Sequence, residues 1–299
     1  MKRIELIVAY DGTDYCGWQV QDNGITVEEV LNTELSRLLN EEIQVIGASR
    51  TDSGVHAMGN VCVFDTETRI PPEKIAFALN VRLPEDIRIQ GSFEVPGNFH
   101  PRHCNSVKTY EYRIWNGTFM NPVVRRYTKF CYYPLNLENM QKAADILVGE
   151  HDFKSFCSTR TNVENTVRTI YSLDIIEKKD PVMNGSTVVI RVTGNGFLYN
   201  MVRIIAGTLL KIGMGMIPWE SMQEILDKKD RAAAGPKIEA CGLTMIGLEF
   251  IDGDNLFSAD DTVSSEEAIK SSEDNESLID DEYSDIKEAE EALSIDKVE

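Results

Sequence analysis

The chain contains 299 residues, enough for one large domain or two of ordinary size, and 42% of them are hydrophobic. Its formal net charge is -19, but residues 252–299 hold 18 acidic and 3 basic residues, which leaves a net charge of -4 for residues 1–251. The charge therefore does not exclude a nucleic-acid partner, because binding depends on local basic patches. No stretch reaches the roughly 20 apolar residues of a membrane helix, and the six scattered cysteines, without a CxxC pair, indicate free thiols. We expect a cytoplasmic protein without a membrane span.

The first half of the chain predicts the order strand, helix, strand, strand, helix, strand. Thr26 and Glu29 have the spacing of a capping box and mark the start of the first helix. Apolar residues then recur at helical spacing, and alternating or β-branched runs mark the strands. The predicted strands cover residues 4–10, 43–50, a run around 61–63 and 87–95, and the second helix begins at Pro71 and Pro72.

The second half predicts the same order without repeating the residues. We expect strands at residues 108–115, 169–177, 187–193 and 244–251, helices at 136–148 and 197–212, and an inserted helix near 219–227. Asn184-Gly185 between the two middle strands is a strong hairpin signal. Each half is therefore a candidate split βαβ unit of the ferredoxin-like type. The sequence predicts an α+β protein with lobes at residues 1–105 and 106–251 and a cleft between them.

The composition changes after Ile251, where serines and acidic residues dominate and aromatic residues are sparse. Such a segment cannot bury enough apolar surface to offset its ordering entropy, so we expect residues 252–299 to form a disordered acidic tail. Two interpretations of this tail stay open. It is either a solvated extension, as charge runs usually are, or a competitor of RNA phosphates for a basic groove.

The string Gly-Ala-Ser-Arg-Thr-Asp-Ser-Gly-Val-His-Ala at residues 47–57 places Asp52 on a turn after a β-branched strand. Asp, Ser and Gly are also ordinary turn formers, so the string alone does not establish a site. A second signal comes from the apolar helix predicted at 197–212, where Gly196, Tyr199, Asn200, Arg203 and Gly207 follow at helical spacing and form one polar and small-residue stripe. A buried arginine there needs a carboxylate or phosphate partner, unless its side chain reaches water instead.

A third signal is the basic and aromatic stretch at residues 99–129, with six Lys or Arg against one acidic residue. Basic side chains neutralise phosphates, and aromatic rings stack on unpaired bases. Some of these rings, such as Tyr110 on an alternating strand, are equally expected in a core. The stretch favours RNA binding. His100 and His103 lack a third metal ligand at suitable spacing, so we expect no metal.

Several motifs in the same order resemble the bacterial tRNA pseudouridine synthase A (TruA) family from residue 4 to residue 251. The matching stretches are residues 10–19, 47–57 with Arg-Thr-Asp-x-Gly-Val-His, 99–102, 108–112, 149–153 and 195–203. One departure is Ile-Glu-Ala-Cys at residues 238–241, where the family usually has a Thr-Ala-Pro-like run. The acidic tail also lies outside the family pattern.

The resemblance implies a pseudouridine synthase fold and an isomerase that acts on tRNA uridines around positions 38 to 40 of the anticodon stem-loop. It also implies a homodimer that uses no metal or cofactor. By match to the motifs, Asp52 is the catalytic carboxylate, Tyr110 stacks on the target base and Arg203 pairs with Asp52. Arg50 and Arg102 contact RNA or help to displace the base.

Two other function classes remain as alternatives. A non-catalytic RNA-binding protein would explain the basic and aromatic stretch but not an Asp–Arg arrangement in a cleft. An enzyme similar to nucleoside hydrolases would use Asp52 against a glycosidic bond and release free uracil. Analysis of the reaction products separates all three classes.

Overall fold

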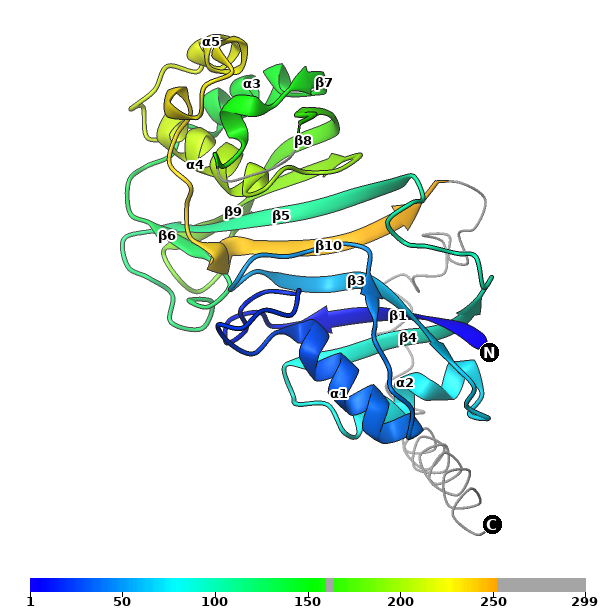
Figure 1. Cartoon of the computed structure of the whole chain (residues 1–299). Coiled ribbons are helices and arrows are strands. Elements are labelled where there is room, and N and C mark those ends of the chain that lie inside the picture. The colour runs from blue at the N-terminus through cyan, green and yellow to red at the C-terminus, as the bar shows by residue number, and fades with distance from the viewer. Residues whose placement is uncertain (160–163, 252–299) are drawn as a thin grey trace.

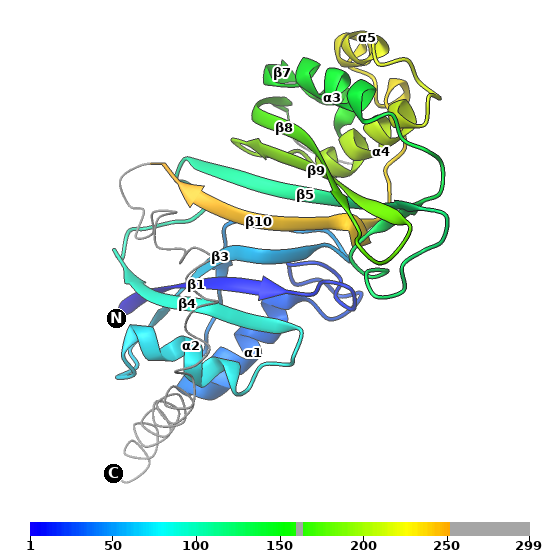
Figure 2. The ribbon, with the colours of Figure 1, turned by 180° about the vertical axis from the view of Figure 1, so that it is seen from behind.

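The structure is a computed structural model that describes residues 1–159 and 164–251. A large mixed sheet runs through it, with two groups of helices at its two ends (Figures 1 and 2). Helices α1 (Val27–Leu39) and α2 (Pro72–Asn80) lie at one end, and α3 (Leu137–Ile146), α4 (Met201–Gly213) and α5 (Ser221–Lys228) at the other. The predicted disordered tail at residues 252–299 lies outside the described residues. None of the described helices is long and apolar enough to cross a membrane.

The sheet is continuous across both halves of the chain, and its strand order is β4-β1-β3-β10-β5-β9-β8-β7. Two short strands extend it, since β2 pairs with β3 and β6 pairs with β5. The strands are β1 (Lys2–Tyr10), β2 (Ile46–Gly47), β3 (His56–Thr66), β4 (Ile87–Val95), β5 (Ser106–Gly117), β6 (Lys129–Cys131), β7 (Gly149–Asp152), β8 (Val167–Lys179), β9 (Gly185–Gly194) and β10 (Leu243–Phe250).

The predicted α+β class with two ferredoxin-like halves is confirmed by this order. In the first half the strands lie β4-β1-β3-β2, and in the second they lie β10-β5-β9-β8. When the four strands of each half are numbered in chain order, with β6 and β7 left out, both halves show the spatial order fourth, first, third, second. The last strand of the second half, β10, joins them because it pairs in parallel with β3 and antiparallel with β5. The division at residues 105 and 106 stays a prediction.

Two clusters of buried apolar side chains hold the sheet. The larger one lies between sheet and helices, and on β1 it takes every second residue, namely Ile4, Leu6, Val8 and Tyr10, because alternate side chains of a strand point to opposite faces. The smaller one lies on the opposite face of β3, where Val61 and Val63 point away from their neighbours Cys62 and Phe64. Both clusters adjoin the loop after β2, so this loop is fixed by packing on either side.

Two predicted elements differ from the structure. The strand expected at residues 43–50 is reduced to Ile46–Gly47, because the N–H groups of Ile43 and Val45 donate to side chains of helix α1 instead of to a strand. The helix expected from residue 197 begins at Met201, because Asn200 adopts a left-handed backbone with φ 62°. Tyr199 therefore lies in a turn before the helix, and the predicted polar stripe is wrong at its start.

Candidate active site

The loop at residues 48–55 leaves the sheet after β2 and carries Asp52. Buried groups hold it on both sides of this residue. Asn60 Nδ2 donates to the Ser49 carbonyl at 3.0 Å, and the hydroxyls of Tyr10 and Thr51 are 2.7 Å apart. The Trp18 amide donates to the Thr51 carbonyl at 3.1 Å. Because backbone and side chains of the loop are both bonded, Asp52 is presented from a rigid support.

Gly17 permits a close contact to this loop beside Asp52. Its backbone has φ +85°, and a Cβ atom at this position would lie 2.6 Å from the Thr51 carbonyl oxygen. Such a distance is far below van der Waals contact, and the positive φ disfavours any residue with a side chain. The segment around Gly17 can therefore lie against the Asp52 loop only because residue 17 is glycine.

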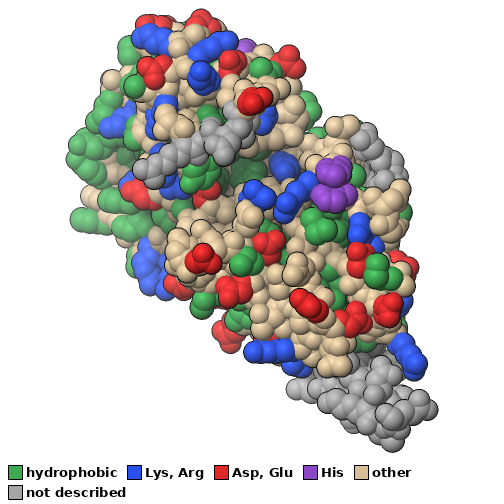
Figure 3. Space-filling model, viewed as in Figure 1, with side chains coloured by type: hydrophobic (Ala, Val, Ile, Leu, Met, Phe, Trp, Pro, Cys, Tyr) green, Lys and Arg blue, Asp and Glu red, His purple; other side chains and the backbone are tan. Residues whose placement is uncertain are grey.

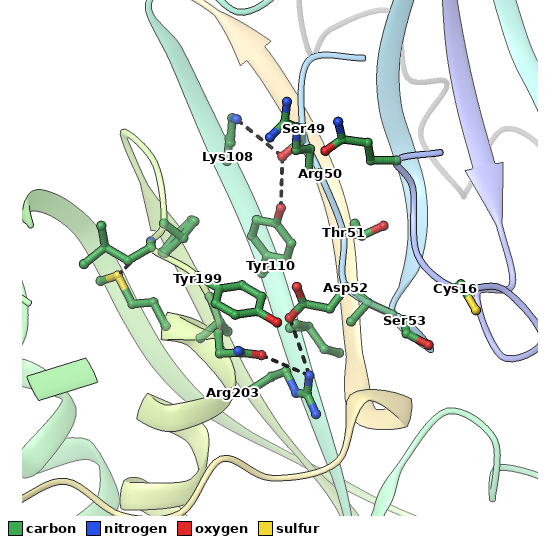
Figure 4. A pocket seen from close by; sticks show the side chains of 18 of the residues that line it. Cys16, Ser49, Arg50, Thr51, Asp52, Ser53, Lys108, Tyr110, Tyr199 and Arg203 are labelled. Atoms are coloured by element: carbon green, nitrogen blue, oxygen red, sulfur yellow. Dashed lines mark hydrogen bonds and ion pairs between the residues drawn. The ribbon is translucent and has the colours of Figure 1, made fainter. Parts of the chain in front are cut away.

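The Asp52 carboxylate lies opposite the Arg203 guanidinium, which projects from the first turn of α4 (Figure 4). Arg203 Nη1 is 3.4 Å from Asp52 Oδ2 and 3.1 Å from Asn200 Oδ1, and Arg203 Nε donates to the Ile238 carbonyl at 2.8 Å. The side chain of Arg203 is 11% exposed and that of Asp52 is 27% exposed. Asn200 and Ile238 thus hold the guanidinium in place beside Asp52, and the Asp52 carboxylate remains accessible to a ligand.

Burial and charge act in opposite directions on Asp52. Burial raises the pKa of its carboxyl above the usual value, and the positive charges of Arg203 and Lys237 counteract part of this rise. The balance leaves the pKa raised. A carboxylate can serve as nucleophile or base only when it is ionised, so Arg203 is needed to keep the Asp52 pKa from rising further.

A cavity of about 760 Å³ lies over this pair and is lined by residues of both halves of the chain. All five sequence-predicted site residues line it: Arg50, Asp52, Arg102, Tyr110 and Arg203. In the space-filling view, basic side chains gather beside the hollow between the two ends of the molecule (Figure 3). The fold thus brings together residues that are far apart in the chain, such as Asp52 and Arg203, which are separated by 151 positions.

Two aromatic rings flank Asp52 in this cavity (Figure 4). Tyr110 on β5 is only 7% exposed and meets Phe197 edge to face, with ring centroids 5.3 Å apart. Tyr199, which precedes α4, is 49% exposed. The sequence predicts Tyr110 as a site residue and places Tyr199 only in the polar stripe. The position of Tyr199 within the motif at residues 195–203 was the signal that could have identified it.

Lys108 is a cavity residue for which the basic stretch at residues 99–129 and the motif at residues 108–112 predict no individual role. Its Nζ is 3.3 Å from both the Ala48 carbonyl and Ser49 Oγ. Burial, with a further contribution from the charge of Arg102, lowers the pKa of Lys108. A lysine held between oxygens of the Asp52 loop is thus part of the site and not a surface charge.

The two remaining predicted residues differ in their surroundings. Arg102 Nε donates to the Gly47 carbonyl at 2.7 Å and so contacts the start of the Asp52 loop. Arg50 is exposed and lines the cavity. His100 and His103 stack on each other with ring centroids 3.9 Å apart. Within residues 1–159 and 164–251, no three side chains form a group that could hold a metal ion.

Comparison with known proteins adds the family context. A family model described as tRNA pseudouridine synthase matches residues 6–103 and 143–250. The chain is 45% identical over 248 residues to tRNA pseudouridine synthase A of Thermoanaerobacter sp. (strain X514), covering 83% of this chain and 99% of that protein. It is 47% identical over 245 residues to tRNA pseudouridine synthase A of Brevibacillus brevis, covering 82% of this chain and 98% of that protein.

Proposed function

Since this chain belongs to the tRNA pseudouridine synthase family, we propose that it isomerises uridine to pseudouridine in tRNA with Asp52 as its catalytic carboxylate. The observation that carries the proposal is the Asp52–Arg203 ion pair at the wall of a cavity lined by both halves of the chain. A cavity of about 760 Å³ falls in the size range of sites for small ligands, so it has room for an extruded nucleotide.

The reaction breaks the N1–C1′ glycosidic bond, turns the uracil and joins C1′ to C5. The C5 proton is lost and N1 gains a proton, so the atoms balance without an external nucleophile or electron acceptor. Asp52 can either attack C1′ or remove the proton from C2′, and both routes require its ionised form. The contacts of Arg203 to Asn200 and Ile238 support this role, because they hold the guanidinium at the carboxylate.

The target uridine must leave its base stack before it can reach Asp52. An aromatic ring at the destination replaces part of the lost stacking, and Tyr110 and Tyr199 are the rings beside Asp52. We assign Tyr110 to contact with the base. Arg50 and Arg102 are assigned to the RNA backbone or to displacement of the base. A target in the anticodon stem-loop around positions 38 to 40, a homodimeric assembly and a cytoplasmic location belong to the same proposal.

Product analysis of the purified protein with unmodified tRNA tests the proposal against the alternatives. Uridine carrying tritium at C5 releases its label to water when C1′ joins C5, and digested tRNA then contains pseudouridine. Free uracil in the supernatant would favour a hydrolase instead. A shift of tRNA in a binding assay without either product would favour a non-catalytic RNA-binding protein and contradict the proposal.

A further inference from the structure

Lys108, Ser49 and Tyr110 form a continuous hydrogen-bonded row on one wall of the cavity (Figure 4). Lys108 Nζ lies 3.3 Å from Ser49 Oγ, and Ser49 Oγ lies 3.2 Å from the Tyr110 hydroxyl. Ser49 and Tyr110 are both buried, with 7% of each residue exposed. The row therefore connects a lysine to the ring that flanks Asp52.

The chemistry of the three groups sets the direction of these hydrogen bonds. A lysine ammonium has only donors, so Lys108 donates to Ser49 Oγ. Ser49 has a single proton, and within residues 1–159 and 164–251 its hydroxyl has no further acceptor than the Tyr110 oxygen. An unpaired buried donor is costly, and the charge of Lys108 polarises the Ser49 hydroxyl into a better donor. Ser49 thus donates to Tyr110.

This direction leaves the proton of the Tyr110 hydroxyl free for another partner. In the part of the chain that the structure describes, Ser49 is the one group hydrogen-bonded to this hydroxyl. Tyr110 also lines the cavity where the nucleotide is proposed to bind, so a bound base can supply the acceptor for this proton. If Tyr110 donated to Ser49 instead, its hydroxyl proton would be taken up by that hydrogen bond, and the Tyr110 hydroxyl could not donate to a ligand.

We infer that Lys108 is a positioning residue, which acts through Ser49 to turn the Tyr110 hydroxyl proton into the cavity, where it donates to a carbonyl oxygen of the target uracil. The inference deepens the proposed function and rests on it. The hydroxyl keeps its proton and acts only as a donor. When the N1–C1′ bond breaks, negative charge develops on the ring and its oxygens, so a fixed donor stabilises the detached base more than the intact nucleotide.

The simpler role for Lys108 is contact with an RNA phosphate, as for any basic residue in the cavity. A phosphate contact would strengthen binding of tRNA and would not depend on the hydroxyl of Tyr110. The hydrogen bonds to Ala48 and Ser49 already use two of the three donors of Lys108 on protein oxygens. The two roles therefore differ in a measurable way.

A double-mutant cycle separates the two roles. Lys108→Met and Ser49→Ala are each made in the wild-type and in the Tyr110→Phe background, and the single-turnover rate and the Kd for tRNA are measured. We expect each substitution to slow wild-type turnover by about 10-fold, the size of one hydrogen bond to the reacting group, with Kd changed by less than about 3-fold. In the Tyr110→Phe background, neither substitution should slow turnover further.

Two controls accompany the cycle. Lys108→Arg keeps a charged donor and should retain most of the wild-type rate. Lys178→Met, on the exposed part of β8, removes the same charge outside the cavity and should leave the rate unchanged. Ser49→Ala is a small change that keeps the test valid if Lys108→Met fails to fold.

An equal loss from Lys108→Met in both backgrounds, or a loss seen in Kd alone, would overturn the inference. Wild-type pseudouridine formation in the same assay tests the proposed function separately. If the double-mutant cycle contradicts the inference while the wild-type protein still forms pseudouridine, the proposed function therefore still holds.

Discussion

Arg203 and Asp52 are 151 residues apart in the chain, yet their side chains form an ion pair with Nη1 3.4 Å from Oδ2. Arg203 lies on α4 of the second half, and Asp52 lies on the loop after β2 of the first half. Strand β10 fixes this relationship, because it pairs with β3 beside the loop and with β5 on the other side. The continuous sheet thus keeps the two parts of the site in register.

Arg203→Met should shift the pH dependence of the single-turnover rate. The positive charge of Arg203 lowers the pKa of Asp52, which burial has raised. Its removal raises this pKa further, and the active carboxylate is then lost at a higher pH when the solution is acidified. We expect the acid limb of the pH–rate profile to move to higher pH. Arg203→Lys retains a charge and should show a smaller displacement. An unmoved acid limb in Arg203→Met would contradict the electrostatic role.

Gly17→Ala should reduce activity because the new Cβ meets the Thr51 carbonyl oxygen at 2.6 Å and displaces the Asp52 loop. We expect a loss of turnover of 10-fold or more, on the order of the cost of a misplaced catalytic group. Gly215→Ala is the matched control, since Gly215 also has a positive φ, +71°, but has open space at its Cβ position. Both variants lose about 1 kcal/mol of stability through backbone strain. Equal turnover in the two variants would contradict the role of Gly17.

Tyr199→Ala should weaken productive binding of tRNA, because it removes the more exposed of the two rings beside Asp52. Loss of one aromatic–base stack corresponds to about 1–3 kcal/mol, or roughly 5- to 150-fold in kcat/KM. Tyr199→Phe keeps the ring and should be close to the wild type. Phe77→Ala removes a partly exposed ring from α2, outside the cavity lining, and should leave kcat/KM unchanged. Full activity of Tyr199→Ala would show that this ring does not contact the base.

The elements that local patterns encode were predictable from the sequence. The apolar run at residues 4–10 specifies β1, and the expected bond from the Glu29 amide to the Thr26 hydroxyl is present at 3.3 Å. The hairpin between β8 and β9 also falls where Asn184-Gly185 predicts it. Such features depend on neighbours in the chain, so one sequence is sufficient to recognise them.

Features that depend on distant contacts were not predictable in the same way. The pairing of β10 with β3 joins His56 to Thr244, and no local pattern encodes a parallel contact of this kind. The late start of α4 depends on the left-handed backbone of Asn200. Asparagine also adopts the ordinary helical conformation, so the residue type alone does not indicate where the helix begins. The strand predicted at residues 43–50 is too long, because the backbone N–H groups of Ile43 and Val45 donate to side chains of α1 and not to a neighbouring strand.

The candidate site shows the same contrast. A buried arginine on a very apolar helix indicates a carboxylate or phosphate partner, and the family resemblance identified Asp52 as that partner. The row from Lys108 through Ser49 to Tyr110 could not, because it depends on how the Asp52 loop lies against β5. The roles of Asp52, Tyr110, Arg203, Arg50 and Arg102 in the reaction stay predictions.

The most direct test of the central claim is single-turnover tritium release from tRNA labelled at uridine C5, measured with Asp52→Asn. The amide is nearly isosteric with the carboxylate, so tRNA should still bind with a Kd close to that of the wild type. Asp14→Asn, an exposed carboxylate outside the cavity lining, serves as the control and should react normally. We predict that Asp52→Asn releases no tritium and forms no pseudouridine. Product formation by Asp52→Asn at the wild-type rate would contradict the catalytic role of Asp52.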